Sequence, residues 1–298
     1  MTDLSDRVAV VTGAGGALGR SHAMHLGQLG ASVVVNDLGS DIAGEGASAS
    51  AAQRVVDEIN STGGTAIANF DSVTTGDGAD RIVQAAIDAF GRIDILINNA
   101  GILRDVSFRN MDLTAFDDVM KVHVYGAFFT TRAAWDHMRE AGYGRIVNTS
   151  SGSGIYGNFG QVNYAAAKSS LIGMTRSLAI EGQRYGIMVN AIAPLAASRM
   201  SEGVMSSELL SRLNPAYVSA LVAYLASEKC STSGQTFSVG GGYYARIGTI
   251  EGPGRTFDDV PSIDDIASAL PAIQDLNDGA EFASLHDQIA RIAQSTTP

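Results

Sequence analysis

Short, mostly apolar runs alternate with helix-length segments along most of this chain, and this alternation limits the possible folds more than any other feature. The runs that we expect to form strands cover residues 7–12, 31–37, 65–70, 93–98, 145–149, 188–192 and 236–239. The helices expected between them cover residues 20–29, 49–61, 77–90, 115–140, 162–185 and 216–227. Because strands joined through helices run parallel, the sequence predicts an α/β fold, a single Rossmann-type domain whose doubly wound parallel sheet carries helices on both faces.

A glycine-rich turn, Gly13-Ala-Gly-Gly-Ala-Leu-Gly19, follows the first expected strand and leads into a helix. Backbone N–H groups in such a turn, together with the helix N-terminus, bind the pyrophosphate of a dinucleotide. The second expected strand ends at Asp37, eighteen positions after Gly19. A carboxylate there accepts a hydrogen bond from the adenosine ribose and repels a 2′-phosphate, so the pattern predicts NAD rather than NADP.

A serine, a tyrosine and a lysine stand at spacings that suit acid–base chemistry. Ser151 lies thirteen residues before Tyr164, and Lys168 follows Tyr164 after four, so the last two share one face of the expected helix. A neighbouring cation lowers the pKa of a phenol, which is about 10 in free tyrosine, and makes the phenol usable as a general base. A serine hydroxyl can orient the oxygen from which the proton moves. The pattern predicts proton transfer between an alcohol and a ketone.

The composition excludes several other classes of protein. With 45% apolar and 17% charged residues the chain is typical of a globular domain, and its net charge of −11 disfavours nucleic acid and anionic membranes as partners. The one cysteine, Cys230, excludes a disulfide framework and cysteine-based zinc sites, and the five histidines form no ligand cluster with the acids. We therefore expect no metal site.

The sequence shows no secretory signal, no apolar run of membrane-spanning length and no peroxisomal Ser-Lys-Leu ending, since its last residues are Ser-Thr-Thr-Pro298. A cytoplasmic enzyme is the resulting prediction. Residues 38–50 are rich in glycine, alanine and serine, and we expect a flexible surface insertion there. Residues 244–298 carry no motif but contain helix-like stretches at 262–270 and 279–293. We expect a catalytic domain over residues 1–243 and a helical C-terminal extension over 244–298.

Three motifs make the chain resemble the short-chain dehydrogenase/reductase family over residues 5–243. They are Thr12-Gly13-x-x-x-Ala17-x-Gly19, Asn98-Asn-Ala-Gly101, and Ser151 with Tyr164-x-x-x-Lys168. Longer strings, such as Ser153-Gly-Ile-Tyr-Gly-Asn-Phe-Gly-Gln161, resemble one branch of that family. This branch comprises the (3R)-hydroxyacyl-CoA dehydrogenase domains of type 2 peroxisomal multifunctional enzymes, also known as 17β-hydroxysteroid dehydrogenase type 4.

The resemblance implies an NAD-dependent oxidoreductase that acts on a secondary alcohol. Tyr164 would take the hydroxyl proton while the hydride passes to the nicotinamide, Lys168 would also bind the nicotinamide ribose, and Ser151 would orient the oxygen. The implied cofactor-binding residues are Gly13, Gly15, Leu18, Gly19, Asp37, Asp71, Ser72, Val73, Asn99, Ala100, Gly101, Tyr164, Lys168, Pro194, Ala196 and Ser198.

Three positions depart from the family pattern. Ala17 replaces a glycine of the turn, which narrows the approach to the phosphates. His123 stands where the family has an asparagine with a water-relay role, and we expect it to be a packed or hydrogen-bonded helix residue. The segment that usually holds the nicotinamide amide reads Pro194-Leu-Ala-Ala-Ser-Arg199, so Ser198 would substitute for a threonine one position early.

The segment between Ser151 and Tyr164 must wall the substrate pocket, and its aromatic and apolar residues suit an acyl chain or a sterol skeleton. Two substrates stay open: a (3R)-hydroxyacyl-CoA, oxidised to a 3-oxoacyl-CoA in lipid or sterol side-chain β-oxidation, or a 17β-hydroxysteroid. Arg104, Arg109 and Arg199 could bind CoA phosphates or stand as solvated surface residues. A catalytically silent dinucleotide-binding protein is the remote alternative, because fold does not fix function.

The two longest expected helices, residues 115–140 and 162–185, mix apolar and small residues around much of their circumference. Such helices suit burial on more than one side. The resemblance implies that they pack against a second copy of the chain, and we expect a homodimer or homotetramer.

Overall fold

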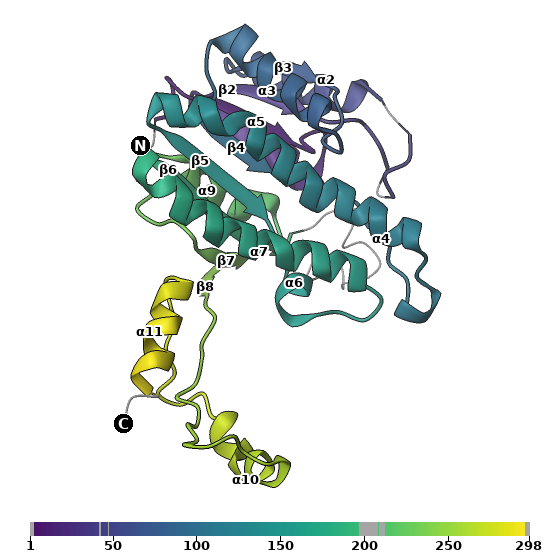
Figure 1. The fold of residues 1–298 in the computed structure, drawn as a ribbon. Coiled ribbons are helices and arrows are strands. Elements are labelled where there is room, and N and C mark those ends of the chain that lie inside the picture. Colours follow the sequence, from purple (N-terminus) through teal and green to yellow (C-terminus); the bar gives the residue numbers. More distant parts are fainter. Residues whose placement is uncertain (1–2, 42, 47, 197–207, 209–211, 296–298) are drawn as a thin grey trace. The chain divides into compact units, whose positions relative to one another are not determined.

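The computed structural model describes residues 3–41, 43–46, 48–196, 208 and 212–295, and the chain divides into two compact units, Met1–Arg246 and Ile247–Pro298. An eight-stranded sheet of order β3-β2-β1-β4-β5-β6-β7-β8 forms the centre of the first unit (Figure 1). Its strands are β1 (Val8–Thr12), β2 (Ser32–Asn36), β3 (Thr65–Asn69), β4 (Ile95–Asn98), β5 (Gly144–Thr149), β6 (Ile187–Pro194), β7 (Thr236–Gly240) and β8 (Tyr243–Ile247).

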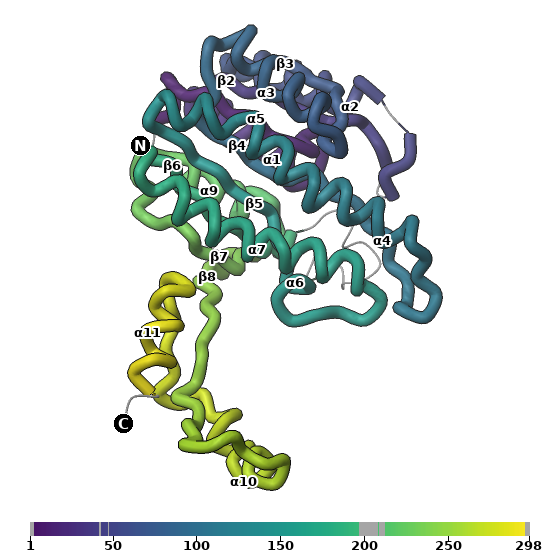
Figure 2. The backbone as a smooth tube through the Cα atoms, viewed as in Figure 1, coloured from purple at the N-terminus to yellow at the C-terminus, as the bar shows by residue number. Residues whose placement is uncertain are grey.

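Neighbouring strands from β3 to β7 are parallel. After β3 the chain crosses to the other side of β1 and enters β4, a path that the backbone tube makes easy to follow (Figure 2). The order of the strands therefore reverses between β1 and β4, and ligands of such sheets bind beyond the carboxyl ends of the strands at that point. Gly241 and Gly242 alone join β7 to β8, and a two-residue connection fits antiparallel strands.

Helices cover both faces of this sheet (Figure 1). Alternate strand residues point to opposite faces, so Val11 and Val33 pack in one apolar core while Val10 and Val34 pack in the other. The first core lies under α1, α2 and α9, and the second under α3, α5 and α7. The helices of this unit are α1 (Ala17–Gln28), α2 (Ser50–Ser61), α3 (Gly76–Phe90), η1 (Phe108–Asn110), α4 (Leu113–Met120), η2 (Lys121–Tyr125), α5 (Gly126–Ala141), α6 (Gly152–Tyr156), α7 (Val162–Gly182), η3 (Gln183–Tyr185) and α9 (Pro215–Ala226). The predicted α/β fold with a doubly wound sheet is confirmed.

One helix that we predicted to be continuous is interrupted in the structure. The segment expected as a single helix over residues 115–140 is α4, then a π-helical turn, Lys121–Tyr125, then α5. Within the π turn the His123 ring is buried and hydrogen-bonded to the backbone of Ile102, a contact outside the helix. Turns of this kind are rare and occur often at functional sites.

Smaller differences concern ends and short elements. Helix α1 begins at Ala17, three residues before the predicted start, and the short helix α6 and the strand β8 were not predicted. In the second unit, α10 (Ile263–Ile273) and α11 (Leu285–Ser295) begin later than predicted. The start of α10 at Ile263 is explained by its N-terminal cap, because the Ser262 and Asp265 side chains each bind the backbone N–H of the other residue.

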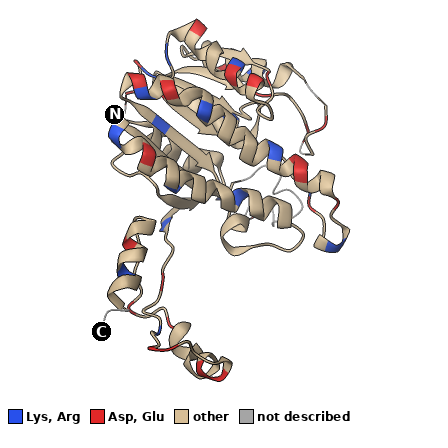
Figure 3. Cartoon of the chain, in the orientation of Figure 1, with Lys and Arg blue, Asp and Glu red and all other residues tan. Residues whose placement is uncertain are grey.

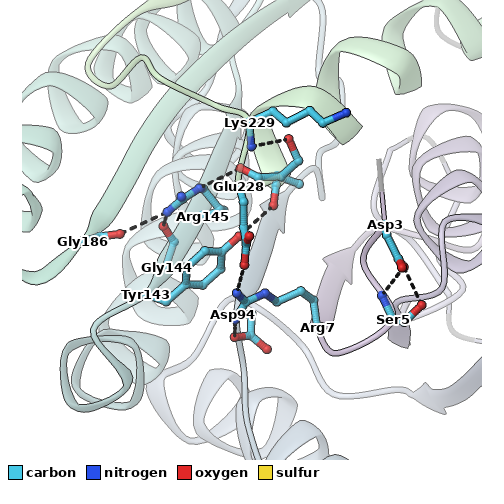
Figure 4. A network of polar contacts seen from close by, with 12 residues as sticks. Asp3, Ser5, Arg7, Asp94, Tyr143, Gly144, Arg145, Gly186, Glu228 and Lys229 are labelled. Atoms are coloured by element: carbon cyan, nitrogen blue, oxygen red, sulfur yellow. Dashed lines mark hydrogen bonds and ion pairs between the residues drawn. The ribbon is translucent and has the colours of Figure 1, made fainter. Parts of the chain in front are cut away.

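At the amino ends of the strands a charged network joins β1, β4, β5 and the end of α9 (Figure 4). The buried Asp94 carboxylate accepts hydrogen bonds from Arg7 Nη1 at 3.1 Å and from the backbone of Val8 at 2.9 Å. The Tyr143 ring lies between two guanidinium groups, those of Arg7 at 3.8 Å and Arg145 at 4.2 Å from its centroid. Since the predicted ligand site lies at the opposite ends of the strands, this network has a structural role.

The second unit contains α10, α11 and a single antiparallel bridge between Glu251 and Ala280. Gln288 of α11 donates to Glu251, and Arg291 donates to the carbonyl of Gly252. Among the described residues, neither helix buries a side chain within the chain itself. Figure 3 shows Lys and Arg interspersed with Asp and Glu along the described residues, and no described helix is long and apolar enough to span a bilayer.

Candidate active site

The glycine turn is fixed to the segment that follows β4. Gly13 has a φ of +63°, and a Cβ there would lie 2.7 Å from the Ala100 Cα atom, so only glycine fits this left-handed, closely packed position. The Thr12 hydroxyl accepts the backbone N–H groups of Asn99 and Ala100, both at 3.1 Å. The Asn99 side chain in turn donates to the carbonyls of Thr12 and Gly13. The two predicted cofactor-lining segments therefore form one rigid edge.

The N-terminus of α1 is open to an anion. No side chain caps it, no acidic residue lies in its first turn, and a Cβ on Gly16 would meet nothing within 4 Å. Free backbone N–H groups and the helix dipole favour a phosphate at such an end. Ala17, which replaces a family glycine, has a φ of 45°, a conformation that costs an L-residue about 1–2 kcal/mol. Leu18 packs partly buried against the core, and Gly19 is buried behind the turn.

Asp37 follows β2 at the adenosine end of this edge. Its two carboxylate oxygens accept backbone N–H groups, from Gly15 at 2.7 Å and from Gly39 at 2.6 Å. The carboxylate is thus held beside the glycine turn, the position that the sequence predicts for contact with an adenosine ribose. At the end of β3, Asp71 accepts Arg81 Nε at 2.6 Å, Ser72 hydrogen-bonds with Thr74 at 2.9 Å, and Val73 is buried.

Ser151, Tyr164 and Lys168 come together at the carboxyl end of β5. Ser151 precedes α6, and its hydroxyl accepts the Ser153 N–H at 3.2 Å and hydrogen-bonds with the Tyr164 phenol. The buried Lys168 donates from Nζ to the Thr149 carbonyl at 2.6 Å, and Nζ lies 5.5 Å from the Tyr164 ring centroid. The predicted acid–base group is therefore assembled from β5 and one face of α7.

The ionisation of this group differs from the sequence-based expectation. Burial raises the pKa of Tyr164 to about 12, against the lowering effect of the hydrogen bond from Ser151, and burial lowers the pKa of Lys168 to about 7. The expectation that Lys168 brings the phenol pKa down is wrong for the protein groups by themselves. Burial is the largest cause of both shifts, because removal from water disfavours the charged phenolate and the charged ammonium alike.

His123 lies against Tyr164. Its ring meets the Tyr164 ring edge-on, with centroids 5.3 Å apart, and Nε2 lies 3.1 Å from the Ile102 N–H nitrogen and 2.9 Å from the Ile102 carbonyl oxygen. Burial, followed by the charge of Lys168, holds the pKa of His123 well below its usual value, so the imidazole is neutral. A Cβ on Gly101 would overlap the His123 ring, which explains a glycine there. His123 is the packed, hydrogen-bonded residue that we expected.

The remaining predicted residues are those after β6 and the three arginines proposed to bind CoA phosphates. Pro194 ends β6 and Ala196 is buried beyond it, whereas Ser198 and Arg199 lie outside the described residues. Arg104 forms ion pairs with Glu45 at 3.2 Å and Asp118 at 3.6 Å, and so is not a free surface cation, while Arg109 is exposed.

The segment between Ser151 and Tyr164, which we predicted to wall the pocket, carries the exposed aromatic rings of Tyr156 (78% exposed) and Phe159 (90%). Phe108 of η1 is a third exposed ring (73%). These rings could contact an apolar substrate chain. The structure also adds three polar residues to which the sequence assigned no individual role: Asp105, Gln161 and the buried Asn163. Gln161 stands three positions before Tyr164 and Asn163 directly before it, and this proximity is the one signal in the sequence that could have drawn attention to them. Among the described residues no group of three or more His, Cys, Asp or Glu side chains could hold a metal ion.

The fold, the glycine cradle and the Ser–Tyr–Lys group define a dinucleotide-dependent alcohol oxidoreductase architecture. The profile of the short chain dehydrogenases matches residues 7–207. The chain belongs to the short-chain dehydrogenase/reductase family.

Individual relatives extend this result. A short-chain type dehydrogenase/reductase of Mycobacterium tuberculosis is 48% identical over 283 residues, which cover 95% of this chain and 99% of that protein. The peroxisomal multifunctional enzyme type 2 of Mus musculus is 51% identical over 241 residues, 81% of this chain but only 32% of the mouse protein. The chain thus spans about a third of the length of that multifunctional relative.

Solved structures agree. The full-length peroxisomal multifunctional enzyme type 2 of Drosophila melanogaster matches with a TM-score of 0.84 and 34% identity, over 99% of this chain and 50% of that one. A 7α-hydroxysteroid dehydrogenase complexed with NADH and a 7-oxo bile acid matches with a TM-score of 0.72 and 29% identity, over 80% of this chain and 95% of that one.

Proposed function

We propose that the protein is an NAD-dependent dehydrogenase that oxidises the 3-hydroxyl group of a (3R)-hydroxyacyl-CoA to a 3-oxoacyl-CoA. One observation carries the proposal: Ser151, Tyr164 and Lys168 meet at the carboxyl end of β5, on the edge of the sheet where the glycine turn follows β1 and Asp37 follows β2. The open N-terminus of α1 fits a pyrophosphate, and the Asp37 carboxylate fits a ribose hydroxyl and repels a 2′-phosphate. These residues support NAD as the cofactor.

Bound NAD would accept the hydride that leaves the alcohol carbon. Tyr164 would take the hydroxyl proton, so the alcohol loses a hydride and a proton and becomes a ketone. Ser151 would donate its hydroxyl hydrogen to the same oxygen as negative charge develops there. Lys168, when protonated, would favour the phenolate over the phenol and offset part of the cost that burial imposes on Tyr164.

The substrate class rests on the resemblance of residues 153–161 to the type 2 multifunctional branch and on the relatives that carry that name. The exposed rings of Tyr156 and Phe159 suit an apolar chain near the reacting carbon. A 17β-hydroxysteroid is the second candidate, and the similarity to a 7α-hydroxysteroid dehydrogenase favours it. An apolar wall discriminates weakly by shape, so the steroid should be oxidised slowly.

The test is a screen that follows NADH absorbance with (3R)- and (3S)-hydroxyacyl-CoA thioesters and with free 17β-hydroxysteroids. We expect the highest kcat/KM for the (3R) thioester, because CoA adds binding contacts that orient the reacting carbon. A preference for the (3S) thioester would overturn the proposed substrate. Tight NAD binding without turnover of any alcohol would overturn the enzymatic function and favour a dinucleotide-binding protein.

We also propose that the chain acts as a homodimer or homotetramer through α5 and α7. A surface groove of ≈ 800 Å³ lies where the ends of these helices meet, and Trp135, Ile180 and Tyr185 line it. Exposed Tyr125 and Phe128 continue the apolar surface along η2 and α5. A monomer in light scattering at micromolar concentration would contradict this assembly. The cytoplasmic location stays a prediction, which cell fractionation can test.

A further inference from the structure

Two chain segments that border the substrate side of the site are joined to each other. The first, residues 104–106, follows the cofactor-lining segment after β4, and the second, residues 153–161, lies between Ser151 and α7. The Val106 N–H donates to the Gly160 carbonyl at 2.8 Å, and Gln161 Nε2 donates to Asp105 Oδ2 at 2.6 Å. The two segments therefore form one wall.

Gln161 is the centre of this wall. Its Oε1 accepts the Ser153 hydroxyl at 2.8 Å and the Asn158 side-chain amide at 3.0 Å, while its Nε2 binds Asp105. Gln161 also occupies the N-cap position of α7, three residues before Tyr164, and its backbone carbonyl accepts the Ala165 N–H at 2.7 Å. The orientation of its side chain is thus tied to the backbone from which Tyr164 projects.

Asn163 adds a second attachment beside the tyrosine. It is fully buried, and its side-chain amide donates to the carbonyls of Arg104 and Ala115, both at 3.0 Å. Its Oδ1 accepts the Tyr164 backbone N–H at 2.8 Å. The first turn of α7 is therefore held from the same segment that contains Asp105.

We propose that Asp105 and Gln161 form a latch that positions Tyr164 and the pocket wall. The inference rests on the proposed function, since it concerns the same acid–base group. Both are positioning residues, and Asp105 acts through its hydrogen bond with Gln161. The latch also positions Phe159, which directly precedes Gly160 and whose exposed ring would line the substrate side of the site.

Two substitutions separate the hydrogen bond of Asp105 from its charge. Asp105→Asn keeps an oxygen that accepts from Gln161 but removes the charge, whereas Asp105→Ala removes both. We expect Asp105→Asn to keep kcat within about threefold, because the hydrogen bond with Gln161 remains. Asp105→Ala and Gln161→Ala should each lower kcat about ten- to a hundredfold, since each breaks a hydrogen bond that involves a charged group, with little change in the KM for NAD. Asp117→Asn is the matched control, because it neutralises an exposed acid of α4 that pairs with Lys121. It should change neither kcat nor the KM for NAD.

Hydrogen exchange tests the latch without any turnover. Asp105→Ala and Gln161→Ala should speed exchange of the backbone amides in residues 153–163, and Asp105→Asn and Asp117→Asn should not. Unchanged exchange and unchanged kcat in Asp105→Ala would overturn the latch. If no alcohol is oxidised by the wild type, the proposed function fails, while faster exchange in Asp105→Ala would still establish the latch.

Discussion

Acidification should destabilise the fold through His22, a histidine of α1 that lies outside the candidate site. Its side chain is 0% exposed, and Nδ1 lies 2.8 Å from the hydroxyl of Ser219 on α9. Burial, with a smaller effect from the nearby His25, lowers the pKa of His22 from 6.5 to about 3. The imidazole is therefore neutral in the folded protein over the whole physiological range.

The size and sign of the effect follow from this shift. The unfolded chain takes up a proton at His22 near pH 6.5, whereas the folded chain does so only near pH 3. Between these values the unfolded state binds more protons, so the contribution of His22 to stability is complete above pH 6.5 and is lost as the pH falls towards 3. Acidification from about pH 7.5 to about pH 5 should cost about 2 kcal/mol of unfolding free energy through this group.

Urea unfolding followed by circular dichroism at both pH values measures the cost. His22→Asn offers an amide to Ser219 but takes up no proton, so it should lose about 2 kcal/mol less than the wild type between the two pH values. His137→Asn, at an exposed position of α5, controls for the substitution and should follow the wild type. Equal losses in His22→Asn and the wild type would refute the assignment, because the other titrating groups are common to both proteins.

Four further outcomes are expected. Tyr164→Phe should lower kcat about 10²- to 10⁴-fold while cofactor fluorescence titration shows unchanged binding, and a near-normal kcat would exclude Tyr164 as the base. Asp37→Ser should reduce the kcat/KM preference for NAD over NADP at least about tenfold by removing a repulsive charge, and a wild type without preference would contradict this reasoning. Ala17→Gly should raise the urea unfolding free energy by up to about 1 kcal/mol, since relief of the left-handed strain exceeds the added chain entropy of glycine, and a clear loss of stability would argue against strain. Asp94→Asn should cost about 3–5 kcal/mol and Glu228→Gln less than about 1 kcal/mol in the same assay. Both acids pair with Arg7, but the Asp94 side chain is buried and the Glu228 side chain is exposed, so equal costs would contradict this reasoning.

Much of the fold could be predicted because its signals are local in sequence. The alternation of apolar runs and helices fixes a parallel sheet, and the turn from Gly13 to Gly19 marks where β1 gives way to a helix. Tyr164 and Lys168 share a helix face by their spacing alone. Each of these conclusions depends on residues within a few positions of one another.

The features that could not be predicted depend on contacts between distant parts of the chain. The helix break at Lys121–Tyr125 surrounds His123, whose ring bonds with the backbone of Ile102, twenty-one positions away. The bond between Gln161 and Asp105 joins residues fifty-six positions apart. The direction of the Tyr164 shift depends on how deeply the fold buries the phenol, and the spacing of Tyr164 and Lys168 carries no information on that depth.

The proposed acid–base group and the wall on the substrate side are held in different ways. The Ser150 hydroxyl donates to the backbone carbonyl of Lys168, and Lys168 Nζ donates to the carbonyl of Thr149. The end of β5 and the residue that follows it therefore hold both the backbone and the side chain of Lys168. Such groups keep their geometry only where packing prevents alternatives, and this part of the site is buried. By contrast, Tyr156 and Phe159 stand exposed on a wall whose shape depends on a few hydrogen bonds through Gln161. Substitutions of the exposed rings of Tyr156 and Phe159 should therefore alter which alcohol is oxidised and leave the proton transfer at Tyr164 unchanged, whereas substitutions that break the hydrogen bonds of Gln161 should affect both.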